Sequence, residues 1–270
     1  PGYLWKLDVP FVWGPFGGTQ NFPWRFLGRA GLGSALVESL RIACNDLQLR
    51  LSPRVRRAAR RAAALVAANS HTQRAFARVH GVQPLLMADT GVRPPAAACS
   101  ASKTRDPTGP LRILWVGELE HRKGLGLLLD ALPRLPADIA YQLRVVGDGR
   151  RSRAWQRLVR RRGLDQHVTW TGRLPHDQAL EQYPWADVFV FSSLRDNLGT
   201  VILEALGVGL PVICLDHQGA HDVVTDQCGI KIPVTTPQRV IDQLAQALAR
   251  LARDPVERER LGRGALERSQ

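Results

Sequence analysis

From Leu111 to the C-terminal residues, short apolar runs alternate with longer stretches of helical periodicity. The short runs are nearly continuous in apolar and β-branched residues, which is typical of parallel strands buried on both faces and connected by helices. The expected strands are 112–117, 141–149, 167–172, 186–193 and 211–216, and the expected helices are 124–135, 153–164 and 176–183, with a loop and a further helix between residues 193 and 211. We therefore predict a doubly wound α/β domain over residues 111–270, in which a ligand would bind beyond the carboxyl ends of the strands.

Residues 1–93 contain fewer strand-like runs. Strands are expected at 9–15, where VPFVWGP ends in a Gly-Pro turn, and at 64–70 and 84–89, with a glycine loop at 16–20 and helices at 32–51, 55–64 and 71–81. These elements form part of a second α/β domain, with too few strands to stand alone. Residues 94–110 are rich in Pro, Ala, Ser and charged residues, so we predict an interdomain linker there.

A chain of 270 residues can bury two ordinary cores without disulfides. The four cysteines, Cys44, Cys99, Cys214 and Cys228, show no CxxC spacing, which predicts free thiols in a reducing cytosol and no zinc site. No apolar run reaches the roughly 18 residues that would span a bilayer. The first residues have the pattern of a loop followed by a strand and do not resemble a signal peptide. We expect a cytoplasmic protein, and the start at Pro1 suggests an internal fragment.

The chain is strongly basic, with a formal net charge of +13 and a pI near 10.8. Such a charge suits nucleic acid, an anionic membrane surface or a phosphate-bearing ligand. The arginines concentrate in two helix-like blocks, 50–61 and 150–162. A solvated helix face is the simplest interpretation of each block, and a membrane-surface patch is the main alternative. No RNP-type aromatic box, zinc-finger spacing or helix-turn-helix pattern accompanies the blocks, which disfavours nucleic acid.

Polar residues follow the expected strands of the second half. After the first strand, Arg122 and Lys123 lie just before or at the start of a helix, where free N–H groups and an ammonium would together favour a phosphate. An exposed loop lysine is the alternative. The next two strands end in glycine, at Gly147 and just before Arg173-Leu174, and glycine lets a ligand approach the backbone closely.

The strongest candidate site is the stretch SLRDNLGTVILEALGVGLPVI, residues 193–213. Asp196 lies on a loop, and Glu204 follows after seven intervening residues in a helix that is apolar nearly all round. A buried carboxylate must find hydrogen-bond donors or lose its charge. The vicinal hydroxyls of a ribose would satisfy it, whereas a glutamate that touches solvent at the helix margin is the alternative.

Taken in order, these features resemble the nucleotide-sugar-dependent glycosyltransferases of the GT-B fold, in particular the retaining enzymes of group 1, often called family 4. The resemblance is carried by the order VG…KG…LL.AL, VVGDG, V.WTGRL, Y..ADVFVFSS, the acid-x7-acid motif and G.PVI, between Ile113 and Val234. The segments PFVWGPFGG, AANSHTQRAF and DTGV resemble the latter half of the acceptor-side domain. The resemblance implies two Rossmann-like doubly wound domains facing a cleft, with the N-terminal one incomplete and the final crossover helix missing.

The resemblance also implies roles for individual residues. Lys123 would contact the donor diphosphate, Glu204 the ribose hydroxyls and Asp196 the hydroxyls of the transferred sugar, so these three are the catalytic candidates. The remaining donor-side candidates are Arg122, Gly147, Arg173, Leu174, Asn197, Leu198, Gly199 and Thr200, and the acceptor-side candidates are Gly14, Gly17 and Gly18. Such enzymes generally work without a bound metal, and no cofactor is implied beyond the donor substrate.

Two residues depart from the family pattern. Glu118 stands where the family usually has arginine, so an anion replaces one expected phosphate cation, and Arg122 or Arg173 would have to compensate. Asp196 stands where glutamate is more usual, which shortens its reach by one methylene.

The function implied is a hexosyltransferase-type retaining glycosyltransferase. It would move a sugar from a nucleotide-diphosphate sugar to a lipid-linked, polysaccharide or other glycan acceptor, with the arginine blocks as a possible peripheral contact with anionic lipid at the inner face of the plasma membrane. The alternative is a catalytically impaired transferase-like module that binds nucleotide or polyanion, which Glu118 and the missing segments favour. No nucleic-acid partner is expected, and the sequence identifies neither the base, the sugar nor the acceptor.

Overall fold

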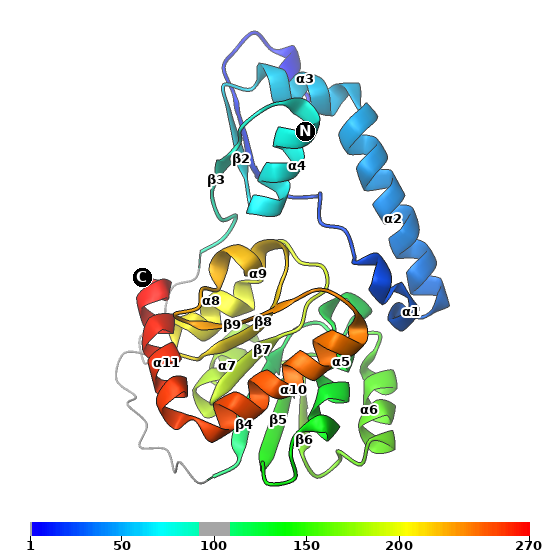
Figure 1. Cartoon of the computed structure of the whole chain (residues 1–270). Coiled ribbons are helices and arrows are strands. Elements are labelled where there is room, and N and C mark those ends of the chain that lie inside the picture. Colours follow the sequence, from blue (N-terminus) through cyan, green and yellow to red (C-terminus); the bar gives the residue numbers. More distant parts are fainter. Residues whose placement is uncertain (1, 92–108) are drawn as a thin grey trace.

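The computed structural model describes residues 2–91 and 109–270 of the chain. The predicted linker at 94–110 therefore lies almost entirely outside the described residues, and the domain boundaries stay predictions. The described residues form two parallel sheets, one of six strands and one of three. Figure 1 shows the larger sheet with its helices below and the smaller one above.

The larger sheet has the strand order β6-β5-β4-β7-β8-β9, and every neighbouring pair is parallel. Its strands are β4 (Leu111–Val116), β5 (Tyr141–Val146), β6 (Val168–Gly172), β7 (Val188–Phe191), β8 (Val212–Asp216) and β9 (Gly229–Pro233). Counted from its first strand, this is the order 3-2-1-4-5-6 of the doubly wound nucleotide-binding fold. The predicted α/β class is confirmed, and the order reverses between β4 and β7, where such folds bind ligands.

Helices cover both faces of this sheet because successive strand residues point to opposite sides. In β4, Ile113 and Trp115 belong to one hydrophobic cluster and Leu114 to the other. The helices are α5 (Leu125–Ala131), α6 (Ser152–Arg161), α7 (His176–Leu180), α8 (Thr200–Gly207), α9 (Gln218–Val223), α10 (Pro237–Arg253) and α11 (Pro255–Ser269). The first cluster includes residues of α5, α6 and α10, and the second includes residues of α8 and α9. All the strands and helices predicted after residue 110 are present.

The smaller sheet has the order β1-β2-β3 and is also parallel. It contains β1 (Val12–Phe16), β2 (Ala64–Ala67) and β3 (Leu85–Leu86), with α2 (Leu32–Leu51), α3 (Pro53–Arg61) and α4 (Ser70–His80). One prediction was wrong: β1 does not end in a turn at Gly14-Pro15 but continues to Phe16. The register with β2 shifts between Trp13 and Phe16, so an irregularity in the pairing accommodates the Gly-Pro step.

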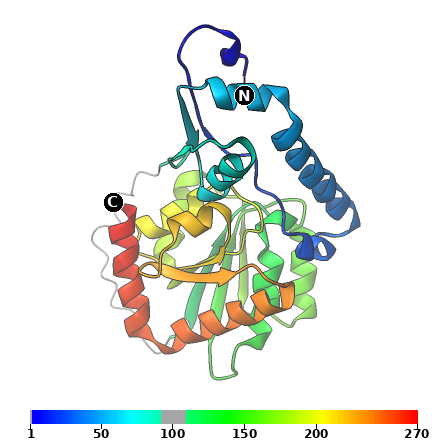
Figure 2. The same cartoon turned by 45° about the horizontal axis from the view of Figure 1, so that its top comes forward.

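Residues 22–31 pack on the larger domain, which the sequence did not indicate. They form η2 (Trp24–Phe26) and α1 (Leu27–Ala30). Phe22, Phe26 and Ala30 are buried in the same cluster as β4 and α5. An Arg151 guanidinium nitrogen donates to the Ala30 carbonyl at 2.6 Å. Figures 1 and 2 both show α2 extending from this contact to α3, so the helix runs from the larger domain to the part of the chain that holds the smaller sheet.

The exposed side of α2 is apolar. Leu36, Leu40, Leu47 and Leu51 are each more than half exposed, and their spacing places them on one face of the helix. Within α2, every residue of which is described, Glu38 is the one buried residue. Four leucines of α2 thus face solvent, whereas its one buried side chain is a carboxylate, and Leu49 packs partly on the cluster that includes Val55 and Phe76.

Candidate functional site

The site is built where the strand order reverses, by the loops that follow β4 and β7. The first loop ends in the short helix η4 (His121–Lys123). The Leu194 amide donates to the Arg122 carbonyl at 2.7 Å, and the Ser192 hydroxyl donates to the Lys123 carbonyl at 3.2 Å. Gly124 follows with φ +67, and a Cβ there would meet the Ser192 carbonyl at 2.1 Å. A glycine is therefore required for the two loops to lie against each other.

Lys123 and Asp196 form an ion pair at the centre of these loops. Both side chains are largely buried, at 17% and 21% exposure. The Lys123 ammonium also lies 5.9 Å from the centroid of the Phe191 ring. The Asp196 amide donates to the Gln218 side-chain oxygen at 2.8 Å, which holds the loop after β7 against the start of α9. The structure thus brings together the residues predicted for the diphosphate and for the transferred sugar.

Glu204 is buried on α8, as the sequence predicted, with 6% exposure. Part of its hydrogen bonding comes from the protein itself, because the Tyr183 hydroxyl donates to Oε2 at 2.5 Å. Tyr183 is fully buried, and burial together with the neighbouring carboxylate raises its pKa well above the usual value. The other oxygen, Oε1, lies 3.9 Å from His176 Nδ1 at the start of α7, so it faces the loop after β6.

The start of α8 joins the Glu204 region to the Lys123–Asp196 pair. Gly199 precedes the helix with φ +83, and a Cβ there would meet the Phe191 ring at 2.8 Å. No side chain caps this helix end, and the Ile202 amide donates to the Gly199 carbonyl at 2.8 Å, so the Thr200 and Val201 amides are the ones that could serve an anion. Leu198 is buried in the second cluster, whereas Thr200 is exposed.

Asn197 is held by the N-terminal part of the chain. Its side-chain oxygen accepts from Gln20 at 2.6 Å and from Asn69 at 2.9 Å. Its side-chain nitrogen donates to Asp89. A Cβ at Gly17 would lie 2.4 Å from the Asn197 oxygen, so this glycine touches the donor-side loop. The structure therefore brings the predicted acceptor-side glycine loop against the predicted donor-side loop.

Two glycines have packing reasons that the sequence analysis did not anticipate. Gly14 lies within the three-stranded sheet, where a Cβ would meet the Val66 carbonyl at 2.2 Å. A Cβ at Gly147 would meet the Gly117 carbonyl at 2.0 Å, so the neighbouring backbone already requires a glycine there. Gly18 has no such neighbour, and its amide donates to Gln20 at 2.6 Å.

The remaining predicted cations differ in their availability. Arg122 is paired with Glu118 at 2.9 Å, so the residue that departs from the family pattern neutralises one of the predicted phosphate ligands. Arg173 is exposed after β6, next to Leu174, which packs on the second cluster. The compensation expected of Arg122 is thus reduced by its own partner.

Two histidines meet between the loop after β8 and α4. The ring centroids of His71 and His217 are 6.2 Å apart, and His71 Nε2 lies 3.2 Å from the Thr19 carbonyl oxygen. Burial, followed by repulsion from His71, lowers the pKa of His217 to about 4. Burial also lowers the pKa of His71. Both rings are therefore neutral at pH 7 and add no positive charge beside the site.

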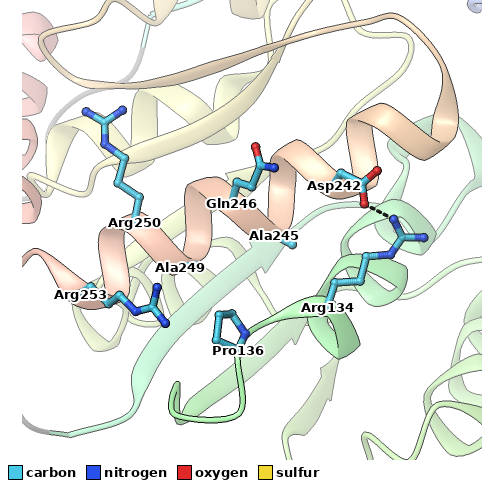
Figure 3. A pocket seen from close by; sticks show the side chains of 8 residues that line it. All are labelled: Arg134, Pro136, Asp242, Ala245, Gln246, Ala249, Arg250 and Arg253. Carbon is cyan, nitrogen blue, oxygen red and sulfur yellow. Dashed lines mark hydrogen bonds and ion pairs between the residues drawn. The ribbon is translucent and has the colours of Figure 1, made fainter.

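A shallow groove lies elsewhere on the larger domain, along α10 (Figure 3). It is lined by Arg134, Pro136, Asp242, Ala245, Gln246, Ala249, Arg250 and Arg253. Its three arginines are paired with Asp242, Glu257 and Asp138 respectively. The groove has neither the helix N-terminus nor the converging loops of the β4–β7 site, so we do not assign the donor to it.

Within residues 2–91 and 109–270, no group of three or more His, Cys, Asp or Glu side chains is arranged to hold a metal ion. No helix in these ranges is long and apolar enough to cross a membrane. Cys44, Cys214 and Cys228 are free thiols, and Cys99 lies outside the described residues.

Sequence reasoning missed several residues that shape the site. Tyr183, Gln218, Gln20 and Asn69 all bond to predicted site residues, and Glu38 contacts their chain neighbours. Gln218 stands at φ +52, a conformation that favours glycine, so its residue type gave no signal of its place in the site. The others act across long sequence separations and leave no local pattern.

The fold and the site define a class. The doubly wound domain, with a cation and two acids at its switch point and a second parallel sheet facing them, has the α/β architecture of GT-B glycosyltransferases. A model of the family described as glycosyl transferases group 1 matches residues 100–268. The chain belongs to this family.

Curated relatives agree with this membership. The chain is 31% identical over 158 residues to an alpha-D-kanosaminyltransferase of Streptomyces kanamyceticus, an alignment that covers 57% of this chain and 39% of the relative. It is 30% identical over 175 residues to a glycogen synthase of Mycobacterium tuberculosis, covering 64% and 41%. The chain thus spans about two fifths of the length of these relatives.

Solved structures share the fold. The Anabaena protein HepE in complex with UDP matches with a TM-score of 0.65 at 20% identity, over 88% of this chain and 72% of that one. A sucrose-phosphate synthase of Thermosynechococcus elongatus matches with a TM-score of 0.64 at 25% identity, over 86% and 57%. Both matches extend beyond the larger domain to the N-terminal part of the chain, since each covers more than the 162 residues of 109–270.

Proposed function

We propose that this chain carries the donor site of a retaining family 4 glycosyltransferase, hexosyltransferase in type. In this proposal Lys123 binds the diphosphate of a nucleotide sugar, Glu204 the ribose hydroxyls and Asp196 the hydroxyls of the transferred sugar. The acceptor is a lipid-linked, polysaccharide or other glycan. The chain spans about two fifths of the length of the curated relatives, so the activity of the whole enzyme is part of this proposal.

The observation that carries the proposal is the Lys123–Asp196 pair at the switch point, next to the uncapped start of the helix that bears Glu204. A nucleoside diphosphate needs a cation and free N–H groups for its phosphates and an acceptor for its ribose diol. The site offers these groups side by side. Tyr183 donates to Glu204 Oε2, whereas Oε1 lies 3.9 Å from His176 Nδ1, so Oε1 is the oxygen that we assign to the ribose.

The proposed reaction is a front-face displacement. The bond between the anomeric carbon and the diphosphate oxygen breaks, and its electron pair leaves with the nucleoside diphosphate. The acceptor hydroxyl oxygen bonds to the same face of the carbon, and its proton passes to the departing phosphate oxygen. Lys123 and the α8 N–H groups stabilise the charge that develops on the leaving group, and no side-chain nucleophile is needed.

A thermal-shift panel tests the donor site. UDP-, GDP- and ADP-sugars, together with the free diphosphates and nucleosides, are added to the purified protein, and sugar hydrolysis is followed in parallel. One base series is expected to raise the melting temperature, with the diphosphates far more effective than the nucleosides, because binding to the native state alone stabilises it. Absence of any shift across the panel would contradict the proposal.

A second candidate function is an impaired module that holds the nucleotide without turnover. The specific observation in its favour is the Glu118–Arg122 ion pair, because Glu118 neutralises an arginine that was predicted to bind phosphate. We predict that Glu118→Gln tightens nucleoside diphosphate binding by about 2- to 5-fold, since exposed ion pairs are worth up to roughly 1 kcal/mol. Calorimetry measures the change, with Glu120→Gln as the neighbouring control. Tighter binding with no gain in sugar hydrolysis would favour the module, and unchanged affinity would exclude Arg122 as a phosphate ligand.

We also propose a peripheral membrane contact through the α2–α3 face. Arg54, Arg56, Arg57, Arg60 and Arg61 are exposed on α3, directly after the helix that exposes the leucines. Apolar side chains beside cations suit the surface of an anionic bilayer, where each charge contributes about 1 kcal/mol. In sedimentation with phosphatidylglycerol vesicles, Arg56→Gln/Arg60→Gln is expected to lower partitioning about tenfold or more. The matched pair Arg153→Gln/Arg157→Gln on α6 should leave it unchanged, and equal losses in both variants would contradict this assignment.

A further inference from the structure

Glu38 is a buried carboxylate in a helix whose leucines face solvent. It is 1% exposed, whereas Leu36 and Leu40 on the same helix are 64% and 58% exposed. Burial of a carboxylate is unfavourable unless cations and hydrogen-bond donors surround it. The one buried side chain of α2 is therefore this carboxylate, and its partners contribute to the packing of the helix against the larger domain.

Those partners come from both loops of the candidate site. The Arg195 guanidinium donates to Glu38 Oε1 at 3.0 Å, and His121 Nε2 lies 3.0 Å from the same oxygen. Both partner side chains are largely buried, at 19% and 13% exposure. Arg41, one helical turn along α2, lies 4.0 Å from the other oxygen, Oε2. A single carboxylate thus connects the loop after β4 to the loop after β7.

The two partners are close neighbours of the proposed donor ligands in the chain. Arg195 directly precedes Asp196, and His121 begins the short helix that ends at Lys123. The Leu194 amide bonds to the Arg122 carbonyl within the same pair of loops, at 2.7 Å. His121 is two residues from Lys123, and Arg195 is next to Asp196. A change in the distance between His121 and Arg195 therefore also changes the positions of Lys123 and Asp196.

The start of α2 is itself fixed on the larger domain. Phe22 and Phe26 are buried in the main cluster, and the Phe22 ring lies 5.7 Å from the His121 ring. Arg29, in α1 directly before α2, pairs with Asp130 of α5. The packed residues 22–31 thus fix the start of α2, and the Glu38 side chain contacts the loops after β4 and β7.

We infer that Glu38 is a positioning residue that clasps the two donor loops together from the acceptor-side helix α2. The inference rests on the proposed function only in calling these loops the donor loops. The carboxylate fixes the spacing of His121 and Arg195, and through them it presets Lys123 and Asp196 for the diphosphate and the sugar. Glu38 itself is not assigned a contact with the substrate.

Hydrogen exchange in the ligand-free protein tests the clasp independently of nucleotide binding. In Glu38→Gln, the amides of Lys123, Leu194 and Asp196 are expected to exchange about tenfold faster, because local opening of both loops becomes easier. The Val212 amide, which bonds to the Cys228 carbonyl at 3.1 Å within the sheet, should keep its rate. Glu267→Gln, an exposed change on α11, is the matched control and should alter none of these rates.

Arg195→Gln is the second variant. If Glu38 acts through Arg195, this variant should accelerate the Leu194 and Asp196 amides to a similar extent, and the double variant should add little. Acceleration of all amides, Val212 included, would show only a general loss of stability and would overturn the inference. Unchanged loop rates in Glu38→Gln would also overturn it.

Donor binding supplies the functional readout. With the nucleoside diphosphate that stabilises the wild type in the panel, Glu38→Gln is expected to weaken binding about fivefold or more, and Glu267→Gln should not. If no nucleotide binds the wild type, the proposed function fails, but the exchange rates still show whether Glu38 holds the two loops together. If loop exchange accelerates but affinity is unchanged, the positioning role is overturned and the proposed function stands.

Discussion

Replacing Glu204 by glutamine is expected to weaken nucleoside diphosphate binding about 10- to 100-fold with little loss of thermal stability. Hydrogen bonds to a charged acceptor contribute roughly 1.5–3 kcal/mol each, whereas the glutamine amide is neutral and its single oxygen cannot serve both the Tyr183 hydroxyl and the ribose diol. Glutamine still offers an acceptor to the Tyr183 hydroxyl, which bonds to Glu204 at 2.5 Å. Calorimetry with the diphosphate that stabilises the wild type measures the change.

The matched ligand for this test is the corresponding 2′,3′-dideoxynucleoside diphosphate. The wild type should bind it far more weakly than the ribonucleotide, and Glu204→Gln should scarcely discriminate between the two. A variant that still discriminates fully would remove Glu204 from the ribose. Alanine is a poorer choice, because it would leave the buried Tyr183 hydroxyl without its acceptor, at a cost of about 1–3 kcal/mol in the free energy of unfolding.

Replacing Lys123 by methionine is expected to weaken nucleoside diphosphates about 10- to 100-fold and the bare nucleoside by less than about threefold. The ammonium serves the phosphates, and a charge-assisted hydrogen bond is worth roughly twice a neutral one. Methionine keeps much of the length of the side chain beside the Phe191 ring. Titration of both ligands into both proteins gives the ratio directly, and equal losses for nucleoside and diphosphate would remove the phosphate assignment.

Asp196 complicates that comparison, because it loses its ion-pair partner in the variant. The double variant Lys123→Met/Asp196→Asn removes both charges. If the loss arises from the missing cation, the double variant should remain weak toward diphosphates. Recovery to wild-type affinity would show instead that the unpaired carboxylate repels the phosphates. The same pairing implies that a bound diphosphate competes with Asp196 for Lys123. Binding of the diphosphate would then release the Asp196 carboxylate for the hydroxyls of the transferred sugar.

Much of the fold could be predicted because its signals are local. The apolar run in β4 and the helical pattern of residues 32–51 both follow from neighbours along the chain, and α2 has the predicted bounds. The meeting of Lys123 and Asp196 was also predictable, since parallel strands place their following loops at one edge of the sheet. The burial of Glu204 followed from the apolar residues around it in α8.

The contacts that set the geometry of the site were not predictable from these patterns. Arg195 and Glu38 are separated by 157 residues, and Gln20 and Asn197 by 177. Nothing in the periodicity of α2 indicates that its carboxylate faces inward and its leucines outward. At Gly147, the close approach of the Gly117 backbone requires a glycine, and the local sequence pattern did not indicate this contact. Local patterns identify elements and candidate residues, whereas the pairing of distant side chains depends on the assembled fold.

A crystal structure with a bound nucleoside diphosphate tests the central claim most directly. We predict that the phosphates lie against Lys123 and the start of α8, with the ribose hydroxyls on Glu204 Oε1. Phosphates bound in the arginine-lined groove along α10, or a ribose that does not contact Glu204, would contradict the assignment of the donor site.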